Sequence, residues 1–118
     1  MSIILEPEQT EELTEGWTEA ELVDIEMERD VQTNYGLKDI VSLWFEFDNG
    51  KKLKEDCISY YAPNSDSKLS RFFRGMGLDL TEKIDAVGLL NKRYKVKVKK
   101  NTDSKGRVWD NIDGVQTL

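Results

Sequence analysis

Eight basic side chains cluster in one short segment, residues 92–107, near the end of this 118-residue chain. The segment holds a single acidic residue, Asp103. Within it, Lys95, Lys97 and Lys99 alternate with apolar residues, and this period of two predicts a strand with the three lysines on one face. Side chains two apart on a strand stand about 7 Å apart, which is close to the phosphate spacing of an extended single strand of nucleic acid.

Two more cations, Lys105 and Arg107, fall in the turn predicted to follow this strand and would lengthen the basic row. A row of this kind would bind phosphate groups without reading base sequence. The alternative interpretation is that these lysines only discourage aggregation through an exposed strand edge. The basic residues alone leave both interpretations open.

A protein that binds single strands also needs aromatic rings on which bases stack. Trp44 and Trp109 qualify because each is out of phase with the apolar residues of its own predicted strand, and Tyr35 lies in a predicted loop. One of Tyr60 and Tyr61 must also point away from the core. Alternatively, these rings are packed under the helix or under the N-terminal arm. The candidate nucleic-acid-binding residues are Tyr35, Trp44, Lys95, Lys97, Lys99, Lys105, Arg107 and Trp109.

The residues that usually perform catalysis or bind metals are scarce in this chain. It has no histidine, and its single cysteine, Cys57, has no histidine to activate it. The aspartates Asp103, Asp110 and Asp113 lack the spacing of a calcium loop, so we expect them to be turn residues. We therefore predict a protein that is not an enzyme and that has no cofactor and no metal.

No apolar run is long enough to cross a bilayer, and the N-terminus lacks the pattern of a signal peptide. A lone cysteine cannot form an internal disulfide. We therefore expect a cytoplasmic protein without a membrane partner.

The net charge of −6 is unevenly distributed. Residues 1–30 hold eleven acidic residues and one basic residue, whereas the rest of the chain carries a net charge of +4. We divide the chain into an acidic N-terminal arm, residues 1–16, and a single domain, residues 17–118. The arm is either a solvated tail or a cover for the basic segment.

Alternating apolar residues predict strands at 17–30, 38–48, 52–62, 93–100 and 107–115. Spacings of three and four predict a helix at 66–76, with Ser65 or Ser67 as its N-cap and Gly77 as its stop. The Asn-Gly pair in residues 48–51 predicts a type I′ hairpin turn. The predicted core consists of Val23, Ile25, Val41, Leu43, Phe45, Phe47, Leu69, Phe72, Val96, Val98 and Ile112.

This order of elements predicts an all-β fold with one main helix between the third and fourth of five strands. It is the order of the OB-fold, a five-stranded Greek-key barrel that binds oligonucleotides. The expected architecture is therefore an OB-fold-like barrel.

Five stretches of the chain together resemble a known group of proteins. They are GWTEAELVDIE at 16–26, YGLKDIVSLWFEF at 35–47, SKLSRFFRGMGL at 67–78, LLNKRYKVKV at 89–98 and WDNI at 109–112. They resemble small phage and mobile-element proteins with an OB-fold that bind single-stranded DNA or act in replication. Asn91 stands where that group commonly has glycine.

The resemblance implies a non-enzymatic module that binds single-stranded DNA in phage or plasmid replication or recombination. It also implies replication proteins as partners and, for a phage protein, the cytoplasm of a bacterial host. The alternative function is an OB-fold interaction or assembly module whose basic face binds an acidic protein partner.

Overall fold

The structure of this chain is a computed structural model that describes residues 13–118. Most of the predicted acidic arm, residues 1–12, lies outside the described part. The elements, in chain order, are β1 (Gly16–Thr33), β2 (Gly36–Phe47), β3 (Lys52–Ile58), α1 (Lys68–Gly75), the 3₁₀ helix η1 (Ala86–Leu89), β4 (Arg93–Thr102) and β5 (Val108–Gln116). The predicted order of three strands, one helix and two strands is confirmed.

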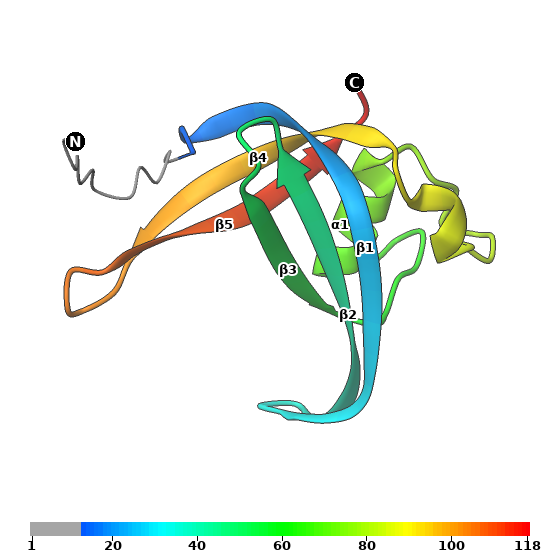
Figure 1. Cartoon of the computed structure of the whole chain (residues 1–118). Helices are drawn as coiled ribbons and strands as arrows, with labels where there is room; N and C mark the ends of the chain where they lie inside the picture. Colours follow the sequence, from blue (N-terminus) through cyan, green and yellow to red (C-terminus); the bar gives the residue numbers. More distant parts are fainter. Residues whose placement is uncertain (1–12) are drawn as a thin grey trace, which may run out of the picture.

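The five strands form one antiparallel sheet in the order β3-β2-β1-β4-β5. The long strand β1 pairs with β4 through residues 16–21 and with β2 through residues 20–33. These two stretches overlap only near Ala20 and Glu21, so β1 is shared between two differently directed parts of the sheet. Figure 1 shows the resulting curvature, with the β1–β2 and β4–β5 hairpins projecting in different directions.

The sheet is not closed into a barrel, in contrast to the expectation from the sequence. Within residues 13–118, β3 and β5 are its two edge strands, and no backbone ladder joins them. Side chains connect the two edges instead. The Ile112 N–H donates to Glu55 Oε2 at 3.3 Å, and Lys51 Nζ lies 2.7 Å from Asp110 Oδ2. What the structure establishes is a five-stranded antiparallel sheet with one α-helix.

Most of the predicted core is confirmed, although Ile25 is only partly buried against it, and one predicted residue is wrong. Val23 is only partly buried, and Leu22 is fully buried in its place. The reason is a β-bulge, because the register with β2 passes from Leu22 opposite Phe45 directly to Asp24 opposite Trp44. The extra residue reverses which side chains of β1 face inward.

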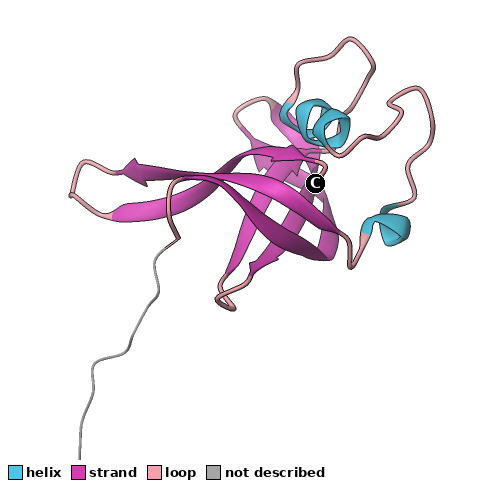
Figure 2. Ribbon diagram, turned by 90° about the horizontal axis from the view of Figure 1, so that it is seen from above, coloured by secondary structure: helices cyan, strands magenta, loops and turns pink. Residues whose placement is uncertain are grey.

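Both predicted ends of the helix are confirmed. Ser67 is the N-cap, and its side chain accepts a hydrogen bond from the Ser70 N–H. Gly77 ends the helix with a φ of 79°, and the Leu78 N–H donates to the Phe73 carbonyl at 3.1 Å. A glycine at this position adopts the left-handed backbone without the clash of a Cβ. The helix lies at the opposite end of the molecule from the tip of the β4–β5 hairpin (Figure 2).

The β2–β3 hairpin occurs where it was predicted, but its turn type is different. Gly50 has a φ of 84°, whereas Asn49 is not among the described residues with positive φ, so the turn is not type I′. The Gly50 N–H donates to the Phe47 carbonyl, and the Phe47 N–H donates to the Lys51 carbonyl. This is the longer hairpin loop in which one residue, here glycine, is left-handed.

Candidate nucleic-acid interface

The predicted alternation along β4 is confirmed. Tyr94, Val96 and Val98 are buried in the core, and the three lysines between and after them are exposed on the opposite face. This outer face belongs to the part of the sheet formed by β4, β5 and the first residues of β1. The β4–β5 hairpin then continues beyond the body of the molecule (Figure 1).

Five cations are distributed along this face and the turn at its end. They are Lys95, Lys97, Lys99, Lys105 and Arg107. Lys97 Nζ lies 3.9 Å from Asp113 Oδ2, and Arg107 Nε lies 2.9 Å from Asp103 Oδ2. The other three form no ion pair with any residue in 13–118. The Lys97–Asp113 pair is exposed and contributes little free energy, so a phosphate group can replace Asp113 at small cost.

Asp103 organises the turn that carries the last two cations. It accepts hydrogen bonds from the backbone N–H groups of Arg107 and Lys105, each at 2.9 Å, and from the Arg107 side chain. The backbone N–H of Arg107 is the main cause that holds the pKa of this carboxyl below its usual range. The acidic residue in the basic segment is thus a structural part of the turn.

Trp109 lies on the outer face, as its phase predicted. It is opposite Asn101 of β4, and 46 % of the residue is exposed. This residue therefore offers a ring to solvent on the face that carries the lysines.

A second tryptophan on this face was missed from the sequence. Trp17 of β1 is opposite Lys97 of β4, which in turn is opposite Gly114 of β5. The Trp17 ring reaches across β4, because a Cβ added at Gly114 would lie only 3.1 Å from its Cη2 atom. Even so, 46 % of Trp17 remains exposed.

The bulge at Val23 explains why Trp17 was missed. Strict alternation from Val23, Ile25 and Met27 back to the start of β1 places Trp17 on the core side. The bulge reverses this phase, so Ala20 and Leu22 are buried and Trp17 points outward. The sequence did contain a signal for this reversed phase. Ala20 and Leu22 are apolar and two residues apart, so they predict that the even-numbered residues at the start of β1 face the core.

Trp44 lies on another part of the sheet. It is opposite Asp24 of β1 and Lys54 of β3, and Lys54 Nζ is 5.7 Å from the centre of its ring. Its β1 neighbours on this face, Glu26 and Asp24, are acidic. The structure therefore does not group Trp44 with the lysines of β4, and the surface around it carries both acidic and basic side chains.

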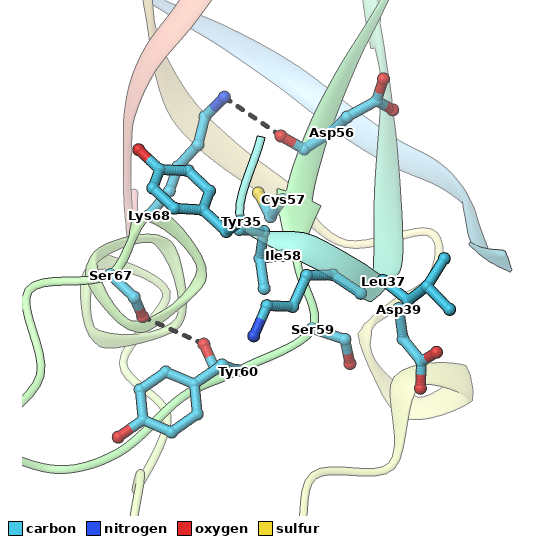
Figure 3. Close-up of a pocket in the computed structure, with 11 residues that line it drawn as sticks. Tyr35, Leu37, Asp39, Asp56, Cys57, Ile58, Ser59, Tyr60, Ser67 and Lys68 are labelled. Carbon is cyan, nitrogen blue, oxygen red and sulfur yellow. Dashed lines mark hydrogen bonds between the residues drawn. The ribbon is translucent and has the colours of Figure 1, made fainter. Parts of the chain in front are cut away.

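Tyr35 also lies apart from the lysines, at the tip of the β1–β2 hairpin. It lines an open pocket of about 830 Å³ together with the end of β3 and the start of α1. Figure 3 shows the residues that line this pocket, among them Tyr35 and Leu37 of the hairpin and Tyr60, whose carbonyl oxygen accepts a hydrogen bond from the Ser67 hydroxyl. Tyr60 is the exposed member of the tyrosine pair, since Tyr61 packs edge-on against Phe73 with ring centres 5.4 Å apart.

Residues 13–118 offer little support for nucleophilic or metal chemistry. Burial is the main cause that raises the pKa of the Cys57 thiol to about 12, so the reactive thiolate does not form near neutral pH. Residues 13–118 contain no group of three histidine, cysteine or acidic side chains that could hold a metal ion.

No protein-family model matches this chain, and a search of curated proteins finds no match either. No helix in the described part of the chain is long and apolar enough to cross a membrane.

Proposed function

We propose that this chain is a non-enzymatic module that binds single-stranded DNA on the outer face of β1, β4 and β5. Bases stack on Trp17 and Trp109, and phosphates lie along the lysines of β4. A role in phage or plasmid replication or recombination is supported by the sequence resemblance described above.

We further propose that the sheet is a variant of the OB-fold. Three features support this assignment: β1 pairs with both β2 and β4, the helix follows β3, and side chains connect the β3 and β5 edges. An OB-fold that binds through the β4–β5 hairpin uses the loop that this fold commonly presents to oligonucleotides.

The row formed by Trp17, Lys97 and Gly114 is the observation that carries the proposal. It places an exposed aromatic ring and a lysine side by side on one sheet face, with a second exposed ring, Trp109, further along β5. Stacking platforms beside a basic backbone track are the two parts that binders of single strands combine. Lysines that only protected a strand edge would not need exposed tryptophans on both sides.

An acidic protein partner is the second candidate function. It is favoured by the carboxylates that Lys97 and Arg107 already bind within the chain, Asp113 and Asp103. A carboxylate-rich partner would use the same cations but would not require the two indole rings.

The test is a titration of the protein with fluorescently labelled oligo-dT at about 50 mM and about 200 mM salt. We expect binding that weakens steeply with salt, because each phosphate contact releases condensed counterions. Trp17→Ala and Trp109→Ala should each weaken binding by about 1–3 kcal/mol. Poly-glutamate serves as the competing probe, and its capture without any binding of oligo-dT would favour the protein partner instead.

A further inference from the structure

Three positions of β5 form a regular row on the outer face. Gly114 lies under the Trp17 ring, Asn111 follows, and Trp109 completes the row. Their partners on β4 are Lys97, Lys99 and Asn101, each two residues from the next, because a bulge absorbs the extra residue of β5. Two residues of a strand span about 6.6 Å, so the two tryptophan rings lie over positions about 13 Å apart.

A row of cations runs parallel to this row on the neighbouring strand. Lys95, Lys97 and Lys99 share the outer face of β4, and neighbouring strands are about 4.8 Å apart. A single strand laid along the hairpin would therefore place its bases above β5 and its phosphates above β4. At about one nucleotide per two residues, the interval from one tryptophan to the other holds three bases.

The middle of these three bases would meet Asn111. This residue is partly buried opposite Lys99, and its side-chain amide has no hydrogen-bond partner within residues 13–118. An amide presents two donors and an acceptor at one end of the side chain. The two outer bases stack on rings, which accept any base, whereas an amide distinguishes bases by their edges.

We propose that Asn111 contacts the edge of the central base of a three-nucleotide site and so sets a base preference there. A carboxamide pairs with an adjacent donor and acceptor on a base edge, and the edges that are free in a single strand differ between adenine and thymine. This inference rests on the proposed function, since it assigns a specificity-determining residue to the same face. It gives a mostly sequence-tolerant site one position with a base preference.

The test compares oligo-dA with oligo-dT of equal length, using the wild-type chain and Asn111→Ala. The quantity to follow is the ratio of the two dissociation constants, because the self-stacking of each strand is the same for both proteins and cancels. We expect Asn111→Ala to change this ratio by about fivefold or more, the low end for loss of a two-bond contact. Gln116→Ala is the matched control, since Gln116 is an exposed amide on the same strand outside the interval between the two rings.

An unchanged ratio in Asn111→Ala, with oligo-dT still bound, would overturn the assignment of Asn111 while leaving the proposed function intact. An equal shift of the ratio in Gln116→Ala would also overturn the assignment of Asn111. If the wild-type chain binds neither oligo-dA nor oligo-dT, the proposed function is wrong, and so is the base preference assigned to Asn111.

Discussion

Replacing the three outward lysines of β4 by glutamine should flatten the salt dependence of oligo-dT binding. The face and its turn carry five cations, and each phosphate that one of them neutralises contributes about −0.7 to the slope of log affinity against log salt. Five contacts give a slope of about −3.5, so affinity should fall about a hundredfold between 50 and 200 mM salt. With Lys95, Lys97 and Lys99 removed, two contacts remain, and the same change should cost only about sevenfold.

Fluorescence anisotropy of labelled oligo-dT measures both slopes directly. The matched control replaces Lys52, Lys54 and Lys83 by glutamine, which changes the net charge by the same amount away from the β4 face. The control should keep the wild-type slope, because exposed charges farther away than a Debye length are screened. A β4 variant that keeps the wild-type slope, or a control that loses as much of it, would refute the placement of phosphates along β4.

Three further substitutions test residues of β5 and the contact between α1 and β5. Gly114→Val should weaken oligo-dT binding about as much as loss of the Trp17 ring, by roughly 1–3 kcal/mol, because a branched side chain occupies the space under that ring. Gly75→Ala should lower the free energy of unfolding by at least about 1–3 kcal/mol in a denaturant titration, because its Cβ would lie 1.8 Å from the Val115 carbonyl oxygen. Asp110→Asn should be less stable than the wild type at neutral pH, and the difference should shrink as the pH falls below about 4.

The sign of the Asp110 effect follows from its surroundings. Burial opposes ionisation, but Lys51 and Lys100 outweigh it and lower the pKa of this carboxyl. A carboxyl with a lowered folded-state pKa adds stability above its unfolded pKa and loses it as the pH falls through the folded value. A stability difference that stays constant or grows on acidification would contradict this explanation.

The two glycine predictions have controls within the chain. Gln116→Val places the same side chain on the same strand and face, opposite Lys95 instead of Lys97, and it should weaken binding less than Gly114→Val does. Gly88→Ala meets nothing within 4 Å and should leave stability nearly unchanged. For Gly75, the gain in helix propensity of about 1 kcal/mol from alanine is smaller than the expected cost of the clash. A Gly75→Ala protein as stable as the wild type would show that the helix can move away from β5.

Much of the fold could be predicted because local rules decided it. Alternation placed the lysines of β4 outside and Val96 and Val98 inside, and Ser67 and Gly77 marked the ends of α1. Asn91 also has a local explanation, since its φ of 63° lies in the left-handed region that favours glycine and tolerates asparagine. Glycine and asparagine are therefore both compatible with the backbone conformation at this position.

What the sequence could not predict depends on pairing between strands. The bulge at Val23 exists only in the register between β1 and β2, and it both removed Val23 from the core and turned Trp17 outward. Closure of the barrel depends on whether the edges β3 and β5 meet, which no local pattern encodes. Likewise, the phase of Trp44 correctly placed it on the outer face, but only the tertiary fold shows that it is partly buried there, between Asp24 of β1 and Lys54 of β3.

The proposed binding face for single-stranded DNA holds Trp17 and Trp109. The chain has three tryptophans, so three variants that each keep one and replace the other two by phenylalanine report on each ring separately. On titration with oligo-dT at low salt, we expect the fluorescence of Trp17 and of Trp109 to be quenched while that of Trp44 is unchanged. Quenching confined to Trp44, or no quenching of any of the three, would contradict binding on this face.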